Sequence, residues 1–121
     1  MIYSGLLKAV KLIGIQQDKL KTLNSLHFTV QGDSMSPTYK DGDSISLHKI
    51  SINDEVGVND IVVFKHPFKE NCKVIKRVIR VKDGSSFFVE GDNPHIASSE
   101  DSHNFGYISR SHLIAVKKEK K

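Results

Sequence analysis

The sequence lacks tryptophan, and it is poor in the other aromatic residues as well. Six phenylalanines and three tyrosines leave few rings on which nucleic-acid bases could stack. The formal net charge is only +4, and much of it comes from the terminal KKEKK stretch at 117–121. A small net positive charge gives a protein only non-specific affinity for nucleic acids. We therefore do not expect nucleic acid as the principal partner.

Cysteine is almost absent too. The single Cys72 cannot form an internal disulfide and belongs to no C-x-x-C motif, which indicates a reducing compartment. The six histidines show neither H-E-x-x-H nor other paired ligand spacing. We expect no metal site and no cofactor.

The sequence also contains no apolar run long enough for a membrane span. Lys8 and Lys11 interrupt the opening stretch, whereas a span needs about 20 apolar residues. Nor is there a small-residue cleavage site after an apolar core, as a secretory signal would have. We expect no transmembrane anchor and a cytoplasmic location.

The opening stretch has apolar residues at helical spacing, which predicts an amphipathic helix over 4–24, within an N-terminal segment 1–25. Its apolar face could pack on the domain or contact a membrane surface, and both interpretations stay open. The face is formed by Ile2, Leu6, Val10 and Ile13.

From residue 26 the pattern changes to short β-rich runs separated by Gly, Asp, Asn and Pro. With 121 residues in all, we expect 26–121 to be one domain. The sequence predicts a mainly β fold, a coiled antiparallel sheet or small barrel with one N-terminal helix. The predicted strands cover 26–31, 43–50, 60–66, 72–81, 86–91 and 112–118.

A candidate nucleophile lies in the segment GDSMSPT at 32–38. Pro37 has a fixed φ and restricts Ser36 to extended conformations, so the chain just after Ser34 is stiff. A serine nucleophile needs a base. The scattered histidines do not identify one.

Lys76 is the better candidate base. In an extended 72–81, Lys76 shares a face with Val74 and Val78. Burial there would lower its pKa and leave a neutral amine able to take a proton. Arg77 cannot play this part, because a guanidinium stays charged in proteins. The alternative is a lysine whose stem covers the sheet while its ammonium reaches water.

Four segments in order resemble the sequence boxes of the signal peptidase I family of Ser/Lys peptidases. They are GDSMSPT, NDIVVFKHP, KVIKRV, and GDN together with SSEDSHNFG. The resemblance implies a coiled β-sheet fold in which Ser34 attacks the scissile carbonyl and Lys76 is the general base. It further implies that Ser99 steadies the lysine amine and that Asp101 helps order its loop.

The chain departs from that family's pattern at three places. Gly32 stands where some members carry a serine oxyanion donor, so the oxyanion hole would rest on backbone N–H groups at Gly32 and Ser34, chiefly the latter. His103 replaces the usual arginine, which would make an ion pair with Asp101 weaker and pH-dependent. The spacing after GDN leaves Ser98 as an alternative to Ser99.

Within the family, the chain looks most like the small soluble proteases that mature nickel-type superoxide dismutase. This resemblance implies that the partner is a precursor protein with an extended N-terminal leader. The alternatives are a peptidase that processes signal peptides and a LexA-like self-cleaving regulator. The latter is disfavoured because no Ala-Gly or Cys-Gly dipeptide occurs as a self-cleavage site.

Overall fold

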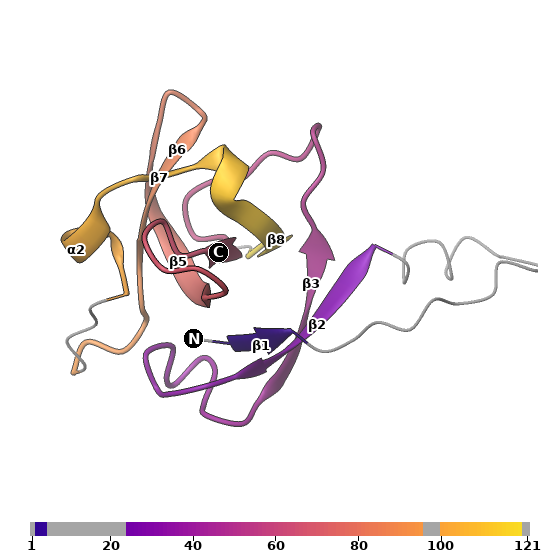
Figure 1. The fold of residues 1–121 in the computed structure, drawn as a ribbon, viewed down its shortest axis with the longest axis vertical. Coiled ribbons are helices and arrows are strands. Elements are labelled where there is room, and N and C mark those ends of the chain that lie inside the picture. Colours follow the sequence, from indigo (N-terminus) through magenta and orange to yellow (C-terminus); the bar gives the residue numbers. More distant parts are fainter. Residues whose placement is uncertain (1, 5–23, 96–99, 120–121) are drawn as a thin grey trace, which may run out of the picture.

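A single antiparallel sheet forms most of the fold (Figure 1). The computed structural model describes residues 2–4, 24–95 and 100–119. Within them the strands follow the order β1-β2-β3-β8-β4-β5-β6-β7, which confirms the predicted mainly β class. The strands are β1 (Ile2–Ser4), β2 (Ser25–Val30), β3 (Ser44–Lys49), β4 (Ile61–Lys65), β5 (Lys73–Lys82), β6 (Ser86–Glu90), β7 (Ile108–Ser109) and β8 (Leu113–Lys117).

Little helix accompanies the sheet. The described residues contain the short helix α2 (Ser102–Phe105) and the 3-10 turn η1 (Arg110–His112). No helix in this part of the chain has the length and apolar character needed to cross a membrane.

The turns follow from local backbone chemistry. Between β5 and β6, Asp83 and Gly84 both take positive φ angles of 54° and 70°. A tight turn of this kind matches the right-handed twist of the strands that it joins, and Asp and Gly are among the residues that tolerate it.

Strand β4 lies at the centre of the core. It pairs with β5 on one side and with β8 on the other, and four of its five residues are buried. Ile61 and Val63 pack into one apolar cluster, while Val62 and Phe64 pack into a second. An uninterrupted apolar run is what a strand covered on both faces requires.

The helix predicted over 4–24 is described only at its two ends, where Ser4 belongs to strand β1 and Asn24 to a turn. Strand β1 pairs with β2 through the registers Ile2↔Val30, Tyr3↔Thr29 and Ser4↔Phe28. The available edge of β2 gives these backbone groups hydrogen-bond partners that three residues could not find within themselves. The remainder of the predicted helix, 5–23, lies outside the described residues.

Candidate active site

The fold brings Ser34 and Lys76 into direct contact. Ser34 lies in the turn that follows β2, and Lys76 lies in the middle of β5. The Nζ atom of Lys76 donates a hydrogen bond of 2.8 Å to the Ser34 Oγ atom. The two residues that the sequence singled out on separate grounds therefore form a pair.

Lys76 is buried, with only 1% of its surface exposed. Its strand neighbours Val74 and Val78 belong to the second apolar cluster, as the predicted alternation requires. The ammonium does not reach water, so the alternative of a solvent-reaching lysine is wrong. Desolvation lowers the pKa of Lys76, although the negative charges of Asp101, Glu100 and Asp92 oppose this shift.

The turn at 32–38 carries the candidate nucleophile Ser34, and we call it the nucleophile turn. It is anchored by the residue beside Ser34. Met35 is completely buried in the first apolar cluster, and its carbonyl accepts a hydrogen bond of 2.9 Å from the Tyr39 N–H. The Ser36 N–H donates to the Asp33 carbonyl at 3.1 Å, and the Ser36–Pro37 peptide is cis. Burying a large side chain here fixes the backbone that carries Ser34.

Residues 91–93 contact this turn closely and donate hydrogen bonds to it. The Asn93 N–H donates to the Ser34 carbonyl at 2.9 Å, and the Asn93 side-chain amide donates to the Asp33 carbonyl at 3.0 Å. Gly91 lies so close to Ser34 that a Cβ atom there would overlap with the Ser34 carbonyl oxygen. The sequence contained the GDN signal, but residue patterns alone assigned no role to Gly91 or Asn93.

Asp92 ties the turn to the strand that carries the lysine. Its carboxylate accepts two hydrogen bonds from Arg77, at 2.8 and 2.7 Å, and one from the Thr38 hydroxyl at 2.5 Å. Burial acts to raise the pKa of Asp92, but the hydrogen bonds from Arg77 and Thr38 outweigh it, and the pKa lies below its usual value. Asp92 is therefore charged at neutral pH and holds both segments together.

We expect Asp92→Asn to destabilise the protein by about 1.5–3 kcal/mol, the usual contribution of hydrogen bonds to a charged group. Urea unfolding at neutral pH measures this effect. Asp83→Asn is the control, since Asp83 is exposed and Asn tolerates its positive φ. Equal stability of the two variants would contradict this role for Asp92.

The predicted supporting residues are only partly described. Asp101 is buried and caps α2 by accepting a hydrogen bond of 2.9 Å from the His103 N–H. The His103 ring, with 61% of its side chain exposed, lies 3.4 Å from Asp101 and 3.7 Å from Glu90. An exposed pair at such distances is weak. Ser98 and Ser99 lie outside the described residues.

The candidate oxyanion donors differ in their present hydrogen bonds. Gly32, with a φ of 85°, donates its backbone N–H to the Asp41 carboxylate at 2.8 Å. To serve as an oxyanion donor, the Gly32 N–H would have to give up this hydrogen bond to Asp41.

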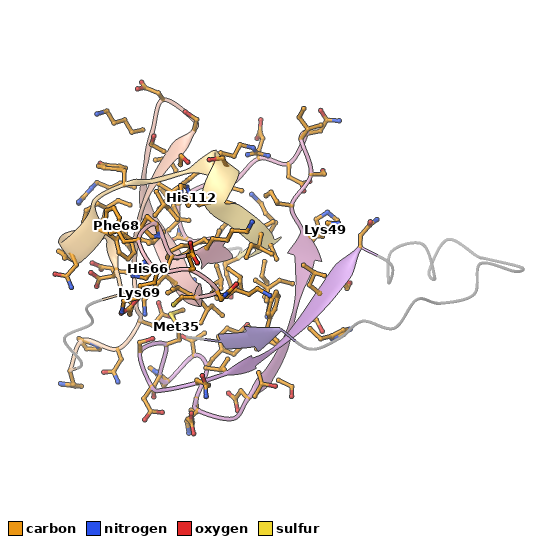
Figure 2. The ribbon with its side chains drawn as sticks, viewed as in Figure 1. Met35, Lys49, His66, Phe68, Lys69 and His112 are labelled. Carbon is orange, nitrogen blue, oxygen red and sulfur yellow. The ribbon has the colours of Figure 1, made fainter. Side chains whose placement is uncertain are left out.

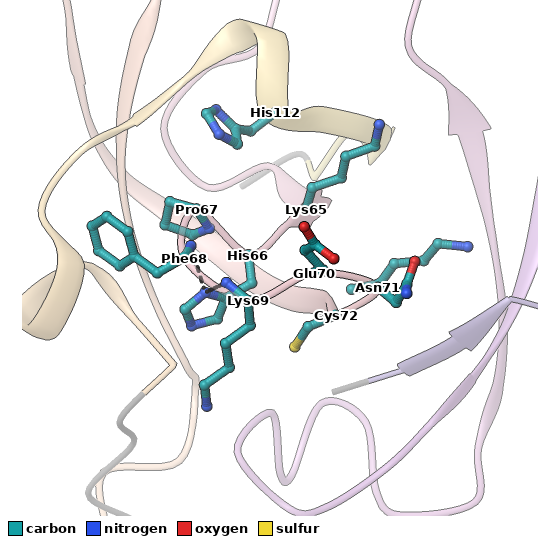
Figure 3. A pocket seen from close by; sticks show the side chains of 10 residues that line it. Lys65, His66, Pro67, Phe68, Lys69, Glu70, Asn71, Cys72 and His112 are labelled. Atoms are coloured by element: carbon teal, nitrogen blue, oxygen red, sulfur yellow. Dashed lines mark hydrogen bonds between the residues drawn. The ribbon is translucent and has the colours of Figure 1, made fainter.

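A separate cavity of about 610 Å³ opens at the β4–β5 hairpin (Figure 3). Residues 65–73 and His112 line it, and His66, Phe68 and Lys69 project near this hairpin (Figure 2). His66 organises the loop: its Nδ1 atom accepts the backbone N–H groups of Phe68 and Lys69. Neither Ser34 nor Lys76 lines this cavity. Across 2–4, 24–95 and 100–119, no His, Cys, Asp and Glu side chains cluster as metal ligands do.

Comparison with known proteins identifies a family for this chain. A family model described as "Signal peptidase, peptidase S26" matches residues 20–85, more than half of the chain. The matched segment contains both Ser34 and Lys76 and ends before Gly91. No curated protein matches the chain.

Proposed function

Because this chain belongs to the signal peptidase, peptidase S26 family, we propose that it is a serine endopeptidase with Ser34 as nucleophile and Lys76 as general base. The observation that carries this proposal is the 2.8 Å contact between a buried lysine amine and a serine hydroxyl. A lysine in an apolar site can be neutral near physiological pH and can activate a nucleophile.

The geometry suggests the following reaction. Neutral Lys76 takes the proton of the Ser34 hydroxyl while Oγ attacks the scissile carbonyl carbon, and the backbone N–H of Ser34 stabilises the oxyanion. The tetrahedral intermediate collapses, and the Lys76 ammonium returns the proton to the leaving amine. A water molecule, deprotonated by Lys76, then hydrolyses the ester on Ser34 and regenerates both residues.

This mechanism predicts a distinct pH profile. Only the neutral amine acts as base, so kcat/KM should rise as the pH increases through the lowered pKa of Lys76. Asp101 is the carboxylate that most strongly opposes the lowering. Asp101→Asn should therefore lower the pKa of Lys76 further and move the acidic limb to lower pH. A rate independent of pH, or an unmoved limb, would argue against Lys76 as the base.

For the substrate, we propose an extended N-terminal leader of a precursor protein, met in the cytoplasm. An extended segment can place its backbone against Ser34, which a folded domain cannot do. The sequence resemblance makes the precursor of nickel superoxide dismutase the first substrate to test. Signal-peptide processing is the second candidate, favoured by the family match.

Co-expression tests this proposal. The precursor is produced with the wild-type chain or with Ser34→Ala, and mass spectrometry determines its N-terminus. We expect removal of the leader with the wild type and an intact leader with Ser34→Ala. An intact leader beside folded wild-type protein would exclude this substrate, and parallel cleavage of a signal-peptide precursor would identify the second candidate.

A further inference from the structure

Strand β1 lies between the two strands that lead to the candidate catalytic pair. Ile2 pairs with Val30 of β2 on one side and with Lys73 of β5 on the other. Val30 lies four residues before Ser34, and Lys73 lies three residues before Lys76. Strand β1 is therefore paired with the two strand segments that lead directly to Ser34 and Lys76.

Among the described residues, one edge of β5 is only partly paired near Lys73. On one side β5 pairs with β4 from Lys73 to Arg77. On its other side β6 begins to pair only at Arg77 and continues toward Lys82. Along Lys73 to Lys76, Ile2 is therefore the sole strand partner on the β6 side among the described residues.

An extended peptide would fit this edge. Peptides commonly bind proteins by adding a strand to an exposed sheet edge, where main-chain hydrogen bonds supply affinity. A peptide between β2 and β5 would be led toward Ser34 and Lys76, because both strands run toward these residues. Strand β1 already occupies the part of this edge next to Lys73.

From these observations we propose that β1 is a built-in plug, which occupies the position where an extended substrate pairs with β2 and β5 and leaves before cleavage. The inference rests on the proposed peptidase function. With only three residues, β1 contributes few ladder hydrogen bonds, and short elements of this kind open at low free-energy cost. A substrate strand that pairs over a longer stretch would displace it.

Two full-length variants test the plug with unfolded casein as the cleavage probe. Tyr3→Pro removes the backbone N–H at the centre of the three-residue ladder between β1 and β2, so β1 should detach and KM should fall at least threefold. The opposite variant combines Tyr3→Cys, Thr29→Cys and Cys72→Ser. Residues 3 and 29 are directly opposite, a spacing that suits a disulfide. Oxidation should hold β1 in place and reduce cleavage at least tenfold, and reduction should restore it.

A binding measurement separates the plug from the chemistry. A fluorescent peptide with the sequence of residues 1–8, MIYSGLLK, is titrated into Ser34→Ala, with and without Tyr3→Pro, and into the oxidised double-cysteine protein. We expect at least tenfold tighter binding when Tyr3→Pro is present and no binding to the oxidised protein. Equal binding to all three, or equal casein cleavage by the oxidised and reduced proteins, would overturn the plug. If no form cleaves casein but the peptide binds selectively, the plug stands and the peptidase proposal falls.

Discussion

Replacement of Lys76 by methionine is expected to lower kcat/KM for peptide cleavage by at least about 10⁴-fold, in line with the loss of a catalytic base or nucleophile in other serine peptidases. Methionine has a similar length and fills the space between Val74 and Val78, but it cannot accept a proton. Ser34→Ala should have a comparable effect. Because the two residues act as a unit, the double variant should be little worse than either single variant.

The same substitution should leave the protein folded, and its stability should depend on pH in a defined way. The folded pKa of Lys76 lies below the ordinary 10.5, so the unfolded chain binds more protons between these two values. Wild-type stability therefore rises with pH across that window relative to Lys76→Met, and the stability advantage of the variant should be largest at low pH.

Urea unfolding at several pH values, together with a cleavage assay, checks both expectations. Lys49→Met is the matched control, because Lys49 is exposed on β3 (Figure 2). It should alter neither activity nor the pH dependence of stability. Substantial cleavage by folded Lys76→Met would refute the assignment of the base.

Gly91→Ala should produce the second largest loss, about 10²-fold in kcat. The added Cβ would overlap with the Ser34 carbonyl oxygen and lie 3.2 Å from its carbonyl carbon, so the nucleophile turn must shift. A displacement of about 1 Å is enough to cost about 10²-fold in rate. The shift would also weaken the hydrogen bond from the Asn93 N–H to that carbonyl.

Gly57→Ala provides the control for Gly91→Ala. No atom lies within 4 Å of a Cβ placed at Gly57, and its φ is not in the positive region. This variant should keep wild-type kcat, and its melting temperature should be equal or slightly higher. If both variants had the same kcat, the close approach of Gly91 would have no part in positioning Ser34.

Much of the fold was predictable because its causes are local in sequence. Alternation along 72–81 correctly placed Val74, Lys76 and Val78 on one face, and turn residues separated the runs correctly. Strand β1 was not predictable in the same way. Three residues show no periodicity, and they are extended because an edge of β2 is available, which is a tertiary cause.

The contact between the two main candidate residues was predictable to a similar degree. Ser34 carried a signal in its stiff turn, and Lys76 in its apolar neighbours. Whether the Lys76 ammonium reached water depended on the packing around β5, which no local pattern contains. The role of Asp92 was hidden for the same reason, since its partners Thr38 and Arg77 lie far from it in sequence and meet only in the folded chain.

Met35 has a consequence for when the protein can become active. Ser34 is placed by its neighbour's insertion into the core, and Lys76 is placed by a strand that packs against the same core. Because small domains usually fold cooperatively, both halves of the pair should assemble in a single transition. A nascent or partly unfolded chain would therefore keep serine and lysine apart, so the proposed peptidase activity would require complete folding.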